Sequence, residues 1–230
     1  MVAARMPLRW PLAALAAFAG LLALVVGGWA PLDRLDADLS AAARGYGTAH
    51  PGVVAWVRIA TDVAATVPFL VAGGAAAALL AARRDRMAAV WCAGVTVVVP
   101  LLWSVLHLVL HRPRPVAGFV TVTSNGFPSG HSANAAAAGL VAVLLFWHRL
   151  GSAGRVAAVL AAGSFTAFVG VTRVLLVVHW PADVLGGWLL SGAVVPLVGW
   201  AVTRLPAGRP TARRQPPSPS GPTGVPGRSE

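Results

Sequence analysis

Carboxylates, cysteine and lysine are all scarce in this sequence. Asp183 is the single acidic side chain between Asp85 and Glu230, Cys92 is the single cysteine, and all 18 basic residues are arginine. One cysteine excludes a disulfide framework and a thiolate metal site. A magnesium site needs several oxygen ligands, and the C-terminal half offers one carboxylate. The sequence therefore predicts neither a bound metal nor a cofactor. The lack of lysine fits the Ala-, Gly- and Arg-rich composition of a GC-rich bacterial genome.

Charged residues are few overall, whereas apolar residues are many. They make up 11% and 57% of the chain, while a soluble domain is typically about 25% charged. This composition predicts an integral membrane protein. Six apolar runs approach the roughly 20 residues that a helix needs to span a bilayer, which predicts an all-α bundle of six transmembrane helices. The runs cover residues 10–30, 61–82, 87–110, 132–147, 156–176 and 182–202.

Two of these runs leave alternatives open. The first is followed by Gly-Trp-Ala at residues 28–30, which resembles a signal-peptide cleavage site. Its length, and Pro31 directly after it, favour a helix that is retained. The fourth run is short for a membrane span unless its helix extends from Ser129 to Arg149.

An even number of helices places both termini on one side of the membrane. The arginines cluster in the segments on that side, and basic loops stay in the cytoplasm, so we expect both termini to be cytoplasmic. The net charge of +11 is then a topology signal, and we expect no nucleic-acid partner. Residues 112–130 and 173–183 would lie at the outer face of the plasma membrane. Residues 1–205 form the predicted membrane domain, and residues 206–230, rich in Pro, Gly and Ser, a disordered cytoplasmic tail.

Three ionisable residues interrupt the apolar sequence before the last run. Arg173, His179 and Asp183 stand within eleven positions, although a charge at the centre of a membrane helix costs roughly 2.5–3.5 kcal/mol. Pro181 suits the first turn of a helix, which would bring Asp183 within reach of His179. A carboxylate on one ring nitrogen fixes the tautomer and leaves the other nitrogen free to attack phosphorus. The alternative is a buried Arg173–Asp183 pair that only stabilises two helices.

A helix start with the properties of a phosphate site is encoded at residues 128–131, Pro-Ser-Gly-His. Ser129 is a good N-cap, and Gly130 allows the backbone to approach a ligand closely. Free N–H groups at a helix start bind phosphate oxygens, and His131 would point into the same pocket. A plain helix cap is the alternative.

Basic residues and histidines surround the end of the third run. Arg112 and Arg114 alternate with prolines, and their guanidinium groups match the geometry of phosphate oxygens. The alternative is that they anchor the helix at the membrane interface. His107 and His111 lie one helical turn apart and could share a face, but they lack acidic or thiolate partners for a metal.

Together these segments resemble the signatures of the type 2 phosphatidic acid phosphatase (PAP2) family, whose pattern is Lys-x6-Arg-Pro, then Pro-Ser-Gly-His, then Ser-Arg-x5-His-x3-Asp. The resemblance runs from the third to the sixth predicted helix. Lysine is replaced by a histidine and serine by a threonine. The corresponding residues are His107-x6-Arg114-Pro115, Pro128-Ser129-Gly130-His131 and Thr172-Arg173-x5-His179-x3-Asp183.

The resemblance implies a metal-independent lipid phosphate phosphatase embedded among membrane lipids. His179 would form a phosphohistidine, Asp183 would orient it, and His131 would act as general acid and base. The substrate would be phosphatidic acid, phosphatidylglycerol phosphate or polyprenyl pyrophosphate. Lipid phosphotransfer through the same intermediate, and a lipid-binding member with weakened catalysis, are the alternatives. The implied phosphate-binding residues are Arg114, Ser129, Gly130 and Arg173, with His107 in the place of lysine and Arg112 beside them.

The replacement of lysine by His107 predicts a dependence of phosphate binding on pH. A histidine with an ordinary pKa near 6.5 is only partly protonated at neutral pH, whereas a lysine would be charged. We therefore expect phosphate binding to weaken at alkaline pH.

Overall fold

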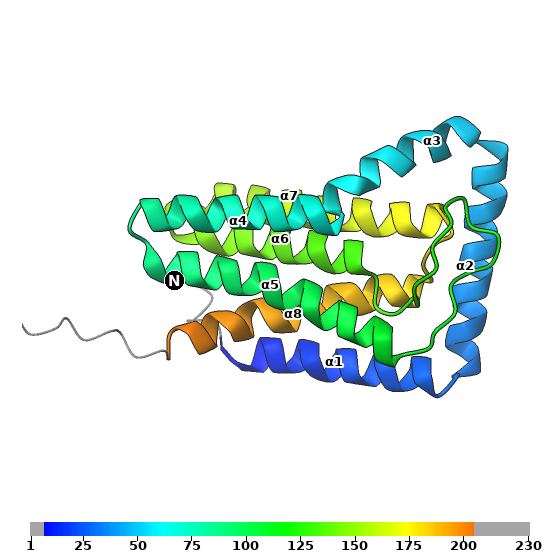
Figure 1. Ribbon diagram of the computed structural model, residues 1–230, viewed down its shortest axis with the longest axis horizontal. Helices are drawn as coiled ribbons and strands as arrows, with labels where there is room; N and C mark the ends of the chain where they lie inside the picture. Colours follow the sequence, from blue (N-terminus) through cyan, green and yellow to red (C-terminus); the bar gives the residue numbers. More distant parts are fainter. Residues whose placement is uncertain (1–6, 205–230) are drawn as a thin grey trace, which may run out of the picture.

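The computed structural model describes residues 7–204, so Arg5 and the predicted tail lie outside the described residues. Within this range the chain is helical without strands, and six segments are long and apolar enough to cross a membrane (Figure 1). The predicted all-α bundle of six membrane-spanning helices is confirmed. Its spans are α1 (Arg9–Val26), the segment Pro51–Ala82, α5 (Arg86–Val109), the segment Gly130–Arg149, α7 (Ser152–Leu175) and α8 (Pro181–Val202).

The second and fourth spans are longer than the apolar runs that predict them. The second contains α3 (Pro51–Ala60), a 3-10 turn, η2 (Thr61–Ala64), and α4 (Thr66–Ala82). The fourth contains α6 (Gly130–Phe146) and a 3-10 turn, η3 (Trp147–Arg149). It therefore has the longer of the two extents considered for the fourth apolar run.

One further helix, α2 (Ala30–Ala49), lies across the end of the bundle (Figure 1). The predicted spans leave this segment unassigned because it is polar and offers no long apolar run. Its buried residues are Asp36, Ser40, Ala43 and Gly47. Their spacing of three to four residues puts them on one face of the helix, and that face covers the bundle end.

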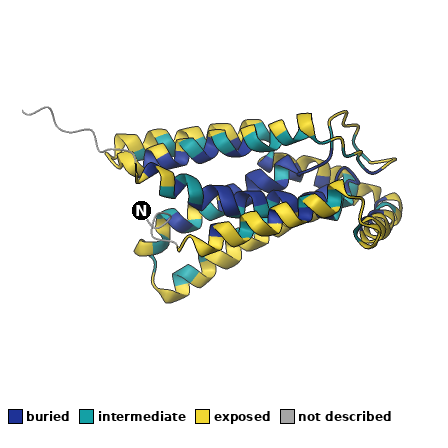
Figure 2. Ribbon diagram, turned by 90° about the horizontal axis from the view of Figure 1, so that it is seen from below, coloured by how far each residue is buried: buried dark blue, intermediate teal, exposed yellow. Residues whose placement is uncertain are grey.

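The core of the bundle surrounds α8. This helix packs against α1, α5 and α6, and the largest buried side chains include Trp91, Val95, Val99 and Val195. The indole of Trp91 donates to the carbonyl oxygen of Val195 at 3.0 Å. The interior of the bundle is buried, whereas the outward faces of the helices are largely exposed and apolar, as a lipid-facing surface requires (Figure 2).

Small residues let α8 approach α6 closely. A Cβ on Gly187 would lie 2.6 Å from the carbonyl oxygen of Ser129, and one on Gly186 would lie 2.6 Å from the ring of Phe127. The absence of a side chain at both glycines thus permits this close contact. It brings the start of α6 against the start of α8, and with them the residues of both motifs.

Candidate active site

The short loop between α7 and α8 presents His179 to Asp183. The carboxylate Oδ2 of Asp183 accepts a hydrogen bond from the Trp180 backbone N–H at 2.9 Å and lies 3.3 Å from Nδ1 of His179. Asp183 therefore caps α8 and meets the imidazole at the same time. Both side chains are buried, at 0% and 2% exposure for Asp183 and His179, so this contact is shielded from solvent.

Arg114 covers the other ring nitrogen of His179. Its Nη1 lies 3.0 Å from Nε2 of the imidazole and also donates to the carbonyl oxygen of Val178 at 2.6 Å. The remaining guanidinium nitrogens bind the loop at Ser124 and Asn125. These partners assign the tautomer in which Nδ1–H donates to Asp183 and Nε2 carries the free lone pair.

The surroundings of His179 keep its imidazole neutral. Burial, reinforced by the positive charges of Arg114 and Arg173, lowers the pKa of His179 well below its ordinary value. A neutral imidazole is the nucleophilic form. The loop therefore holds a histidine with its lone pair directed toward a guanidinium, where an anion would bind.

Arg173 has donors to spare at the end of α7. Its side chain is 7% exposed, and Nη1 donates to the hydroxyl of Thr61 at 3.3 Å. Its buried Nε has no hydrogen-bond partner among the described residues. A buried guanidinium with an unpaired donor is costly unless a ligand satisfies it, and a phosphate oxygen has the required charge and acceptor capacity.

His131 and the backbone of the first turn of α6 face the same group of cations. His131 is half-buried and close enough to Arg173, His179 and Arg114 to interact with them electrostatically. Its ring makes no hydrogen bond within residues 7–204. Nor do the backbone N–H groups of Gly130 and His131 have a partner there, so the helix start keeps free donors for an anion.

Ser129 and Gly130 also have packing roles. The hydroxyl oxygen of Ser129 accepts from the hydroxyl of Ser132 at 3.0 Å and from its N–H at 3.4 Å, which is the predicted N-cap. A Cβ on Gly130 would lie 2.9 Å from the indole of Trp103, so helix packing requires the glycine here. The Ser129 N–H donates to the carbonyl oxygen of Asp183 at 2.9 Å and ties the two motifs together.

Arg112 binds carboxylates on both sides. It donates to Asp183 Oδ1 at 2.5 Å and to Asp36 Oδ2 at 2.6 Å. Asp36 Oδ1 in turn accepts the N–H of Ala182 in the first turn of α8 at 2.9 Å. Two donors of Arg112 are therefore committed to carboxylates, which makes Arg112 a bridge between α2 and the His179–Asp183 pair.

Asp36 is the site residue that the sequence analysis misses. It is 1% exposed, and burial raises its pKa above the ordinary value against the opposing effects of Ala182 and Arg112. No motif surrounds Asp36 in the sequence. Only the placement of α2 across the bundle end brings it to the site. An acidic residue on the face of an amphipathic helix that is expected to be buried is, however, a feature by which such a site residue can be found in a sequence.

A cavity of about 460 Å³ lies beside the site, between the end of α1, α2 and the end of α5. Asp36, Arg112 and Trp180 are among its lining residues, whereas His131, Arg173 and His179 are not. No group of three His, Cys, Asp or Glu side chains that could hold a metal ion occurs in the described part of the chain.

The sequence also matches a model of a known protein family. The model of the PAP2 superfamily matches residues 88–206, more than half of the chain. The chain belongs to the PAP2 superfamily. Phosphatidylglycerophosphatase B of Bacillus subtilis (strain 168) is 41% identical over 94 residues, which cover 40% of this chain and 46% of that relative. The chain thus aligns with about half the length of this curated relative.

A solved structure shares the fold over nearly its whole length. It is the crystal structure of a transmembrane PAP2 type phosphatidylglycerolphosphate phosphatase from Bacillus subtilis. The TM-score is 0.69 at 28% identity, and the similarity covers 87% of this chain and 99% of that one. The membrane-spanning PAP2 fold therefore extends beyond the matched family model.

His107 and Thr172, the two residues that differ from the PAP2 pattern, have different hydrogen-bond partners. His107 Nε2 bonds the carbonyl oxygen of Pro128 at 2.7 Å, and the carbonyl oxygen of His107 accepts from Asn125 at 2.7 Å. The His107 ring thus supports the loop before α6, and only Nδ1 remains for another partner. Thr172 donates to the carbonyl oxygen of Val169 at 2.6 Å and lies 2.9 Å from the hydroxyl of Thr61, the same hydroxyl that accepts from Arg173.

Proposed function

We propose that this PAP2 protein is a membrane lipid phosphate phosphatase that works without metal through a phosphohistidine at His179. The observation that carries the proposal is the environment of one imidazole. Asp183 lies on its Nδ1, Arg114 lies at its Nε2, and burial lowers the pKa of the ring well below its ordinary value, which favours the neutral form. This arrangement supplies an oriented nucleophile beside a cation that can exchange its contact with Nε2 for a phosphate oxygen.

The first half-reaction transfers the phosphoryl group to His179. The Nε2 lone pair forms a bond to phosphorus while the phosphorus–oxygen bond to the lipid breaks. The electron pair goes to the leaving oxygen, which takes a proton from His131. Arg114, Arg173 and the free N–H groups at the start of α6 stabilise the charge on the equatorial oxygens.

The second half-reaction returns the enzyme to its starting state. Water gives a proton to His131 and attacks phosphorus, the nitrogen–phosphorus bond breaks, and inorganic phosphate leaves. General acid–base help of this kind contributes about 10²–10⁴-fold. Asp183 keeps His179 in the productive tautomer in both steps, and Arg112 with Asp36 holds Asp183 in place.

A lipid with a phosphomonoester or pyrophosphate head group suits a site at the end of a membrane bundle. Among these lipids the names of the two similar proteins favour phosphatidylglycerol phosphate over phosphatidic acid and polyprenyl pyrophosphate. The distribution of arginines supports a site at the outer face of the plasma membrane with both termini in the cytoplasm. Residues 1–205 would form the phosphatase domain.

A panel of lipid phosphates tests the proposal on the full-length protein in detergent. We expect phosphate release with a chelator present, fastest from phosphatidylglycerol phosphate, and none from a His179→Ala variant. Release that needs a divalent metal, or that continues in His179→Ala, would contradict the mechanism. A phosphorylated acceptor lipid without free phosphate would indicate phosphotransfer instead.

A further inference from the structure

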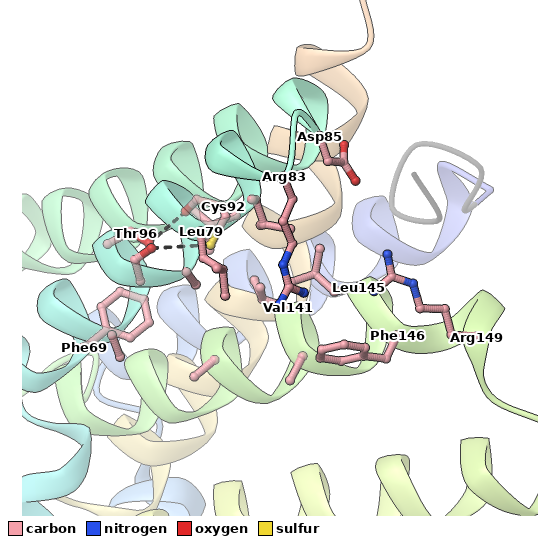
Figure 3. Close-up of a pocket in the computed structure, with 17 residues that line it drawn as sticks. Phe69, Leu79, Arg83, Asp85, Cys92, Thr96, Val141, Leu145, Phe146 and Arg149 are labelled. Atoms are coloured by element: carbon pink, nitrogen blue, oxygen red, sulfur yellow. Dashed lines mark hydrogen bonds between the residues drawn. The ribbon is translucent and has the colours of Figure 1, made fainter.

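A second cavity lies at the end of the bundle opposite the candidate active site. It measures about 310 Å³ and is enclosed by α4, α5 and α6, which is within the usual range of roughly 300–1,000 Å³ for ligand pockets. Phe69 lies at one end of the cavity, and Arg83, Asp85 and Arg149 lie at the other (Figure 3). The proposed function uses none of these residues.

The interior of this cavity offers a hydrocarbon environment. Alanine, leucine, valine and phenylalanine side chains make up most of its wall. The thiol of Cys92 lies 3.6 Å from the carbonyl oxygen of Gly73, and the hydroxyl of Thr96 donates to the carbonyl oxygen of Cys92 at 2.8 Å. Because both polar groups already have partners, the interior presents no unpaired donor and suits an acyl chain.

The mouth of the cavity is cationic. The side chains of Arg83 and Arg149 make no hydrogen bond or ion pair with any of residues 7–204, and both residues are exposed. Asp85 is the one carboxylate in the lining, and it accepts the N–H of Ala88 at 3.1 Å as the cap of α5. Two unpaired guanidinium groups therefore face the mouth, where they can bind the oxygens of one phosphate.

The position of the mouth matches the depth of lipid head groups. Arg83 follows the end of α4, and Arg149 ends the span Gly130–Arg149, so both lie where membrane helices meet the interface. Ala138 and Ala142 line the cavity and are exposed on the outer side of α6. A lipid can thus enter from the bilayer, with its chain between α4 and α6 and its head group at the arginines.

We propose that this cavity binds an anionic phospholipid, with one acyl chain inside and the head-group phosphate between Arg83 and Arg149. Such a lipid is bound and not turned over, because the thiol of Cys92 and the hydroxyl of Thr96 each bond a backbone carbonyl oxygen, and the carboxylate of Asp85 is committed as the cap of α5. The site lies at the other end of the bundle from His179. Its occupancy therefore does not depend on whether the proposed phosphatase activity is correct.

Native mass spectrometry of the full-length protein, with phosphatidylglycerol or phosphatidylcholine added to the detergent, tests the proposal. We expect preferential retention of phosphatidylglycerol and about a thirtyfold loss of that preference in the double variant Arg83→Gln/Arg149→Gln. The matched control is Arg204→Gln, since Arg204 lies at the same end of the bundle but stacks on Trp200 at 3.6 Å and does not line the cavity.

A second measurement locates the lipid directly. Phosphatidylglycerol with a photoreactive group in its acyl chain should crosslink to the peptides of α4, α5 and α6 that line the cavity, and an Ala142→Phe change should block this crosslink. Equal retention of the two lipids would overturn the proposal. So would a preference that Arg114→Gln abolishes and the double variant does not, because the lipid would then occupy the active site.

Discussion

Asp36 offers a sharp test of how the site is held together, because it touches no substrate in the proposed mechanism. It anchors Arg112 at 2.6 Å and the start of α8 through Ala182 at 2.9 Å, and Arg112 binds Asp183 at 2.5 Å. The change Asp36→Asn keeps the size of the side chain and an oxygen for the Ala182 N–H. It removes the negative charge that pairs with Arg112 and replaces the oxygen that accepts from Arg112 with an amide NH2 group, which cannot accept.

The expected loss of activity follows from the contact between Asp36 and Arg112. A hydrogen bond to a charged group contributes about 1.5–3 kcal/mol, and each 1.4 kcal/mol corresponds to about tenfold in rate. If the whole contact serves to position Asp183, and through it His179, then kcat falls about tenfold to a hundredfold. KM should change little, because Arg114, Arg173 and the start of α6 are untouched.

Steady-state phosphate release from a lipid phosphate in detergent measures this effect. Asp38→Asn is the matched control, since Asp38 is exposed on the same helix and has no hydrogen-bond partner among residues 7–204. Asp36→Ala should lose more activity than Asp36→Asn because it also leaves the Ala182 N–H unpaired. Equal kcat values in Asp36→Asn and Asp38→Asn would refute the positioning role of α2.

Four further predictions concern the site itself. Arg173→Lys should raise KM about tenfold or more in lipid-phosphate kinetics, because a lysine lacks the planar fork of donors; an unchanged KM would argue against phosphate binding there. His107→Leu should lower thermal stability by about 1–3 kcal/mol, since it leaves the buried carbonyl oxygen of Pro128 unpaired, and His107→Gln should recover part of the loss. His107→Lys should alter the alkaline limb of the pH–rate profile if Nδ1 reaches the phosphate, and an unaltered limb would restrict His107 to loop support. Because the pKa of His179 is lower in the folded chain than its ordinary value near 6.5, the unfolded chain binds an extra proton as the pH falls below about 6.5, and stability is lost in that direction. Melting temperatures should therefore fall more steeply below about pH 6.5 in the wild type than in His179→Ala, and parallel curves would contradict the neutral imidazole.

Much of the fold was predictable because membrane-spanning helices follow from the length of the apolar runs in the sequence. Five of the predicted runs lie within or close to observed helices, and the fourth agrees once its polar start at Ser129 and end at Arg149 are included. The helix α2 was not predictable in this way, since its burial depends on packing across the bundle end. The second span also begins earlier than its apolar run, because α3 and η2 continue it toward α2.

The site was predictable where chemistry and local geometry coincide. The spacing of His179 and Asp183 around Pro181 predicts their contact, since a helix start places them together. The partners of Arg112 and His107 were not predictable, because they come from segments distant in sequence. Arg112 forms an ion pair with Asp36 of α2, and His107 bonds the carbonyl oxygen of Pro128 in the loop before α6. Both residues therefore support the site in ways that their motif positions do not indicate.

The central claim is that His179 carries the phosphoryl group between the two half-reactions. Rapid quench of the full-length protein during turnover of a lipid with a radiolabelled phosphoryl group, followed by peptide mapping under alkaline conditions, measures this directly. We predict label on the peptide that contains His179, with no label in His179→Ala and much less in Arg114→Gln. Turnover by the wild type without labelled protein, or label that persists in His179→Ala, would contradict the account.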